Sequence, residues 1–296
     1  MLDQLRQLIE ANCRGDGLIG TADPDLTLFR SRKPGRWVAS PPDMPLREPA
    51  LCVVVAGHKA ATIGTRRVAY EPGFCTVSSV ELPVTNMTVD ATEAEPFLGL
   101  RLSLDQSVLS ELWARFTPPT LMTVPDWPVS ASPLTGGIVE PLIRLLRHLD
   151  DPLDLAVIAP DTRREVIYRL MRGAHGGILA QLANRDSRLS QVMRSITHIR
   201  STFTEPLHIA ELAKMASMST SSFHDHFKRI TTMTPLQYQK QLRLHEARRL
   251  IFEGSTDAAR AGFAVGYESP SQFSREYKRL FGAPPLRDAT RFRQAS

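Results

Sequence analysis

The stretch GYESPSQFSREYKRLFGAPP, residues 266–285, combines a glycine-led turn, small polar groups, cations and aromatic rings. At 100° per residue, Phe273, Tyr277 and Leu280 fall on one side of a helical wheel. The polar positions lie opposite this side or on its flanks: Ser271, Gln272, Ser274, Arg275, Lys278 and Arg279. The pattern predicts an amphipathic helix that buries its rings. Gly266, which precedes the helix, suits a tight turn that needs a positive φ.

The same pattern occurs once more, 50 residues earlier. SSFHDHFKRITTMTP, 221–235, aligns with SQFSREYKRLFGAPP, 271–285, and each copy follows a shorter apolar segment, LHIAELAKMA or TDAARAGFAV. Two short helices joined by a tight turn form a helix-turn-helix, whose second helix can enter a DNA major groove. We therefore predict two such units, at about 207–231 and 257–281. One continuous helix across 235–254 would join them and place the two second helices in successive groove segments, about 34 Å apart.

Charge and side-chain chemistry favour a nucleic-acid partner for this part of the chain. Residues 187–296 hold 17 Lys and Arg against 9 Asp and Glu, whereas residues 1–186 hold 19 against 22. A basic half beside a slightly acidic half suggests that only the basic one meets a polyanion. Arg and Gln can pair with guanine and adenine edges, and cations near the helix ends can neutralise phosphates. The predicted phosphate contacts are Lys228, Arg229, Lys278 and Arg279.

The first part of the chain reads as a sheet followed by helices. Between residues 49 and 105 the apolar positions have period two, as at Leu98, Leu100 and Leu102, and glycine and proline divide the region into short strands. After Asp105, a predicted helix N-cap, the spacing becomes helical, with further helices expected at 138–149 and about 162–182. We therefore expect an α+β chain: a β-sandwich or barrel with flanking helices at 1–182, a linker at 183–187, and an all-α domain at 188–296.

Composition and the isolated ligand-type residues exclude several other classes. The chain is 42% hydrophobic and 23% charged, and its longest apolar run, at 50–56, is too short to span a bilayer. A cytoplasmic protein with no membrane partner is expected. Cys13, Cys52 and Cys75 form no C-x-x-C pair, so buried reduced thiols are the simplest interpretation, with oxidant or aldehyde sensing left open. His58 stands alone.

Two further observations argue against a metal site and against an enzyme. The side chains of His224 and His226, two positions apart on a helix, diverge by about 200° and so cannot chelate as i, i+4 pairs do. The sequence has no P-loop, no dinucleotide fingerprint and no visible group of nucleophile, base and orienting residue. We predict no metal, no cofactor and no enzymatic activity.

The two repeated segments and the helix expected between them resemble the AraC/XylS class of bacterial transcription regulators, over residues 188–290. The resemblance implies base-edge contacts from the first turns of each second helix, at Ser221, His224 and Asp225 and at Gln272, Ser274 and Arg275. Two positions depart from the pattern: Ser217 replaces a common turn glycine, and Gly262 replaces an alanine, which is expected to weaken the second unit. Residues 49–105 resemble the cupin-like sensor domain of one AraC-type subfamily.

The resemblance implies a transcription factor that binds double-stranded promoter DNA under the control of a small effector sensed in the first domain. RNA polymerase is a further expected partner if the protein activates, and a second copy of the chain is a candidate partner. The alternatives are a cupin-type metal-dependent enzyme with a DNA-binding appendage and a constitutive architectural binder with an inert sandwich. The effector, the operator, the sign of regulation and the oligomeric state are left open by the sequence.

Overall fold

The computed structural model describes residues 1–37, 49–63, 66–80, 84–115, 127–254 and 257–295. The chain divides into two compact units, one made of residues 1–82 and 86–190 and one made of residues 83–85 and 191–296. The first is rich in strands and the second is helical, so the predicted α+β class is confirmed. The boundaries predicted from the sequence, with a linker at 183–187, stay a prediction. No helix among the described residues is both long and apolar enough to cross a membrane.

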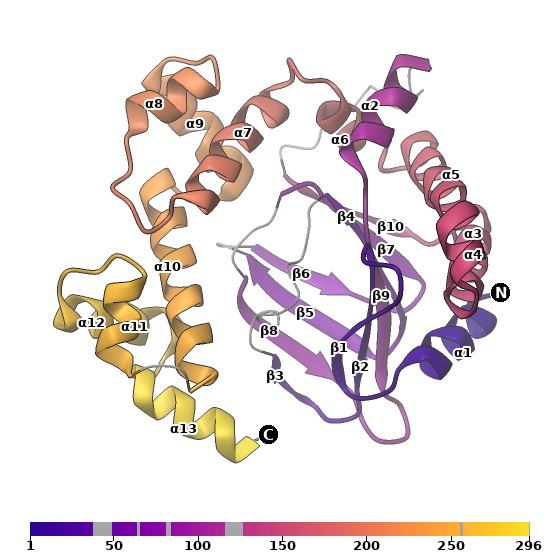
Figure 1. Cartoon of the computed structure of the whole chain (residues 1–296), viewed down its shortest axis with the longest axis horizontal. Coiled ribbons are helices and arrows are strands. Elements are labelled where there is room, and N and C mark those ends of the chain that lie inside the picture. The colour runs from indigo at the N-terminus through magenta and orange to yellow at the C-terminus, as the bar shows by residue number, and fades with distance from the viewer. Residues whose placement is uncertain (38–48, 64–65, 81–83, 116–126, 255–256, 296) are drawn as a thin grey trace. The chain divides into compact units, whose positions relative to one another are not determined.

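The first unit is a sandwich of two antiparallel sheets (Figure 1). The larger sheet has the order β1-β2-β9-β4-β7-β10 and the smaller one β3-β8-β5-β6. The strands are β1 Gly17–Gly20, β2 Leu26–Ser31, β3 Gly35–Trp37, β4 Ala50–Ala56, β5 His58–Ile63, β6 Arg66–Tyr70, β7 Phe74–Ser78, β8 Val84–Asp90, β9 Phe97–Ser103 and β10 Val129–Pro133. Strands β1 to β3 and β10 lie outside the period-two region, so the sheets extend beyond the predicted range.

The larger sheet is covered on both faces, which explains its apolar content. Helix α1, Leu2–Asn12, contacts β2, β4 and β9, and its Leu5 and Ile9 are fully buried. The opposite face meets the smaller sheet, and there Phe29, Val54 and Phe97 share an apolar cluster with Val89 of β8. Because both faces are covered, the alternation in β9 does not separate buried from exposed residues, and Arg101 is only 4% exposed.

Further helices complete the first unit. They are α2 Gln106–Arg115, α3 Gly136–Arg147, a 3₁₀ turn at His148–Asp150, α4 Pro152–Val157, α5 Ala159–Arg172 and α6 Gly176–Ala183. Asp105 precedes α2 and accepts a hydrogen bond from the Ser107 amide at 2.7 Å, as its N-cap prediction requires. The helical region expected at about 162–182 consists of two helices: α5 ends at Arg172, and Gly173, whose backbone is extended, separates it from α6.

The second unit is all helical: α7 Arg188–Ser201, α8 Ile209–Met215, α9 Thr220–Thr231, α10 Pro235–Phe252, α11 Ala258–Ala264, α12 Pro270–Phe281 and α13 Pro285–Ala295. Helix α7 begins at the boundary between the two units. Helix α10 is continuous, as predicted, and joins the α8–α9 pair to the α11–α12 pair (Figure 1). A capping box at Thr234 and Gln237, with Pro235 as the first helical residue, starts α10 sharply.

Candidate nucleic-acid interface

The first helix-turn-helix consists of α8 and α9. The turn between them contains Ser217 with φ of +54°, the left-handed conformation that a turn glycine would adopt more easily. The side chain of Ser219 then accepts a hydrogen bond from the amide of Ser222 at 3.3 Å and caps α9. This turn and cap set the direction in which α9 leaves α8.

The rings of α9 hold it against α10. Phe223 and Phe227 are fully buried, with ring centroids 5.5 Å apart, and Phe227 meets the ring of Tyr238 on α10 edge-on at 5.7 Å. Ile230, predicted to share this face, is half-buried. Aromatic pairs in this geometry stabilise a fold beyond the area that they bury. The buried side of α9 is therefore spent on packing.

The opposite side of α9 faces solvent. The predicted contact residues Ser221, His224, Asp225, Lys228 and Arg229 are all exposed. Arg229 donates a hydrogen bond to Nδ1 of the half-buried His226 at 2.8 Å, so its guanidinium is partly engaged within the helix. The exposed side thus carries short polar groups near the helix start and cations near its end, the order in which base edges and phosphates would be met.

The second helix-turn-helix consists of α11 and α12. Gly266 has φ of +88°, which confirms that this turn needs a glycine. Ser269 caps α12 by accepting from the amide of Gln272 at 3.4 Å, and Pro270 is its first helical residue. Helix α12 then buries Phe273, Tyr277 and Phe281, whereas Leu280, predicted to point inward, is half-buried.

Gly262 on α11 has a packing role that the sequence did not reveal. A Cβ atom added at this position would lie 3.0 Å from Cγ of Phe273, closer than most Cβ contacts in proteins. The absence of a side chain lets the Phe273 ring approach the backbone of α11. The glycine therefore brings the two helices of the second unit together.

The solvent side of α12 carries the other predicted contacts. Arg275, Lys278 and Arg279 are exposed, and so is Ser271, whereas Gln272 and Ser274 are half-buried. The side-chain amide nitrogen of Gln272, Nε2, donates to Glu276 Oε1 at 3.3 Å. Gln272 must therefore give up this bond before its amide can bind an adenine edge.

Cations on the linker helix and cations on α9 and α12 differ in their partners. On α10, Lys240 pairs with Glu276 at 2.9 Å, Arg248 with Asp288 at 2.8 Å, and Arg249 with both Glu246 and Glu253. The hydrogen bonds that Arg249 donates to its two carboxylates, foremost the one to Glu246, raise the pKa of Arg249. Within the part of the chain that the structure describes, the exposed cations Lys228, Arg275, Lys278 and Arg279 form no ion pair. Those four charges are available to a polyanion.

A buried polar cluster anchors α12 from behind. The Tyr277 hydroxyl donates to Asp288 on α13 at 3.0 Å, and Arg248 on α10 donates to the same carboxylate. The Arg248 guanidinium also lies 4.4 Å from the centroid of the Phe281 ring. Burial raises the pKa of Tyr277, which keeps its hydroxyl protonated as a donor. Three helices are joined at this carboxylate.

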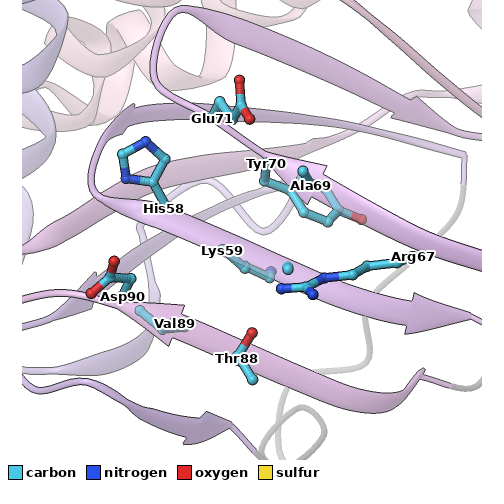
Figure 2. A pocket seen from close by; sticks show the side chains of 10 residues that line it. His58, Lys59, Arg67, Ala69, Tyr70, Glu71, Thr88, Val89 and Asp90 are labelled. Atoms are coloured by element: carbon cyan, nitrogen blue, oxygen red, sulfur yellow. The ribbon is translucent and has the colours of Figure 1, made fainter.

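In the first unit, the smaller sheet carries a hollow of about 260 Å³ lined by residues of β5, β6 and β8 (Figure 2). His58 lines this hollow and is exposed. Residues of both charges line it as well, including Arg67, Glu71 and Asp90. Among the described residues, no three or more His, Cys, Asp or Glu side chains gather closely enough to hold a metal ion.

The three cysteines form no disulfide bond among the described residues, and one of them meets a histidine. Cys13 and Cys75 are buried and Cys52 is half-buried. Sγ of Cys75 lies 3.3 Å from Nε2 of His175, and Ser132 Oγ lies 2.9 Å from the same nitrogen. Burial raises the pKa of Cys75 and lowers that of His175 to about 4, so both groups are neutral near pH 7. Since activated cysteines are thiolates that substrates can reach, this buried pair has the character of a structural contact.

Comparisons with known proteins agree with this architecture. The profile described as AraC-type transcriptional regulator N-terminus matches residues 23–178, more than half of the chain, and a helix-turn-helix domain profile matches residues 212–291. The HTH-type transcriptional activator RhaS of Salmonella paratyphi A is 27% identical over 171 residues, 57% of this chain and 58% of RhaS. The HTH-type transcriptional regulator ArgR of Pseudomonas aeruginosa is 26% identical over 58% of this chain and 52% of its own length. The chain thus spans between about half and three fifths of the curated relatives that it matches.

A solved structure extends the likeness of fold over most of the chain. ToxT from Vibrio cholerae aligns with a TM-score of 0.57 at 9% identity, covering 89% of this chain and 94% of ToxT. Identity this low supports the fold alone, whereas the match to residues 23–178 supports the family. The resemblance predicted from the two repeated segments is confirmed: this chain belongs to the family of AraC-type transcriptional regulators.

Proposed function

We propose that this chain is a sequence-specific DNA-binding regulator of transcription in which α9 and α12 enter successive major-groove segments of promoter DNA. The observation that carries the proposal is the division of cations in the second unit. On α10, Lys240, Arg248 and Arg249 are held by carboxylates, whereas Lys228, Arg275, Lys278 and Arg279 are exposed and form no ion pair among the described residues. Such charges bind phosphate at the cost of few internal contacts. Because the bacterial chromosome lies in the cytoplasm, we expect the protein to act there.

The contacts follow from the side chains at the start of each recognition helix. Arg275 matches the bidentate acceptors of guanine, and Gln272 matches adenine once it leaves Glu276. On α9, Ser221 and His224 can donate or accept, whereas Asp225 only accepts and so favours a cytosine amino group. Base contacts are assigned to Ser221, His224, Asp225, Gln272, Ser274 and Arg275, and phosphate contacts to Lys228, Arg229, Lys278 and Arg279.

The first unit is proposed to sense a small molecule. The support is the sandwich fold, the hollow on its smaller sheet, and the ToxT structure of similar fold, which has an unsaturated fatty acid bound. RhaS is named an activator, so RNA polymerase is the partner to test if this chain activates, and a second copy of the chain is the other. The relatives are named as regulators of transcription, which favours this function over a metal-dependent cupin enzyme with a DNA-binding appendage.

The test selects DNA from a random duplex pool with the full chain and then measures binding by fluorescence anisotropy. The wild type should enrich a two-part sequence. Arg275→Ala should weaken binding by about 5-fold to 150-fold and relax the preference at one base pair, since one good bidentate contact contributes about 1–3 kcal/mol. Arg172→Ala, an exposed arginine of α5, is the matched control. Enrichment of no sequence, or equal binding by both variants, would refute the proposal.

A further inference from the structure

One side chain of α10 joins the two helix-turn-helix units. Nε of Arg243 donates to the carbonyl oxygen of Phe203 at 2.6 Å, and Nη2 donates to those of Thr204 and Glu205, each at 3.0 Å. Nη1 donates to the carbonyl oxygen of Gly266 at 2.8 Å. The first three acceptors lie between α7 and α8, and the fourth lies in the turn of the second unit. The guanidinium therefore ties the segment before α8 to the turn before α12.

The two backbone segments approach each other closely at this junction. A Cβ atom at Gly266 would lie 2.4 Å from the carbonyl oxygen of Thr204, so no other residue fits there without movement. Phe203 packs against the apolar cluster of the second unit, which includes Phe273. Gln239 adds a hydrogen bond to the Glu205 carbonyl oxygen at 2.7 Å. The junction is thus a direct contact between the segment before α8 and the turn before α12, and the hydrogen bonds of Arg243 add to it.

The first helix-turn-helix, α8 and α9, is also connected to the segment 203–205, through helix α7. Ser195 of α7 donates its hydroxyl to the carbonyl oxygen of Leu212 on α8 at 2.8 Å. A shift of the segment at 202–205 would therefore move α7 and, with it, α8. Through this chain of contacts the placement of α9 depends on the junction.

The chemistry of the junction suits arginine alone. The four bonds run to carbonyl oxygens of four residues, and burial lowers the pKa of Arg243. A planar guanidinium offers five donors in a fixed fork, whereas the ammonium of lysine is a compact point donor that cannot span these acceptors. Apolar packing on α10 is non-directional, so these hydrogen bonds supply the orientation that packing alone would leave loose.

We propose that Arg243 is a positioning residue that fixes α12 relative to α9 and so makes the protein select operators by the spacing of their two elements. The proposal rests on the proposed function. One base pair inserted between the elements moves the second by about 3.4 Å and turns it by about 35°. Hydrogen bonds allow little change in distance, so the junction cannot move α12 to the shifted element. Helix α12 then loses its base contacts.

The test uses the full chain and duplexes chosen from a random pool by the wild type, with zero, one or two base pairs inserted between the two elements. For the wild type, one insertion should weaken binding by about 100-fold, the loss of roughly two base contacts. For Arg243→Lys, which keeps the charge, and for Arg243→Met, the insertion penalty should fall below about 10-fold. Arg249→Gln, on the same helix but in a surface ion network, should behave as the wild type.

Each outcome decides the matter. If the wild type enriches no two-part sequence, the proposed function itself fails. If it does, but the Arg243 variants keep the wild-type insertion penalty, the function stands and the role of Arg243 is wrong. Gly266→Ala disturbs the same contact from the turn and gives a second measurement if Arg243→Met does not fold. A merely structural role would lower the melting temperature and leave the ratio of affinities for the two spacings unchanged.

Discussion

Replacing Lys228, Lys278 and Arg279 together by glutamine should reduce the salt dependence of DNA binding by a calculable amount. These side chains are exposed and form no ion pair among the described residues, so their replacement breaks none. Arg229 is left unchanged because it already donates to His226. Each phosphate contact adds about 0.9 to the slope of log affinity against log salt concentration. The slope should therefore fall by about 2.7, which makes the affinity loss between 50 and 200 mM salt about 40-fold smaller.

The assay is anisotropy titration of one selected duplex at five salt concentrations. A control triple variant, Arg14→Gln, Lys33→Gln and Arg147→Gln, removes the same charge from exposed positions of the first unit. If phosphate contacts made by α9 and α12 cause the slope, the control keeps the wild-type value. An equal fall in both variants would show that net charge alone attracts DNA, and an unchanged slope in the first variant would remove the assigned phosphate contacts.

Three stability predictions follow from individual contacts. Ser217→Gly should raise the free energy of unfolding by about 0.5–1 kcal/mol in urea titrations, because glycine adopts the left-handed turn without steric cost; a loss of stability would contradict that explanation. Gly262→Ala should lower the free energy of unfolding by about 1–3 kcal/mol, since the new methyl group meets the Phe273 ring; an unchanged urea midpoint would mean that the ring moves freely. Burial lowers the pKa of His175 to about 4 against 6.5 unfolded, so this group leaves stability intact above pH 6.5 and reduces it as the pH falls toward 4. At pH 5 the wild type should have lost about 2 kcal/mol that His175→Gln does not lose, and identical pH profiles of the two proteins would refute the assignment.

The helical half of the fold could be predicted from the sequence because its signals are local. The repeat aligned Phe223 with Phe273, and both are buried as the wheel requires. The left-handed turn at Gly266 and the continuity of α10 also follow from residue type and spacing. Such features depend on helical periodicity and turn chemistry, which a single sequence carries.

The sheets were predicted only where apolar and polar residues alternate along the sequence. All six residues of β2 are buried, and Arg30 among them is held by Asp16 at 3.0 Å, so the strand has no period-two pattern to detect. The ion pairs of α10 were also out of reach in part. Glu246 pairs with Arg249, whereas Arg243 binds backbone carbonyls. Carbonyl acceptors have no residue type, so no sequence pattern can reveal that junction.

The structure also changes how the two recognition helices compare. From the sequence, Gly262 suggested a weakened second unit, but here the glycine admits the Phe273 ring to α11. On exposed positions α12 carries three cations and no carboxylate, since Glu276 is half-buried against Lys240, whereas α9 carries two cations and Asp225, a net charge of +1. We therefore expect α12 to contribute the larger share of the salt dependence of the proposed DNA binding. In the proposed complex, Asp225 would repel phosphate and accept only from a cytosine amino group, so α9 would bind DNA less strongly but discriminate between bases. In the proposed complex, a junction that holds both helices in one register would let the attraction of α12 for phosphate bring α9 onto its bases.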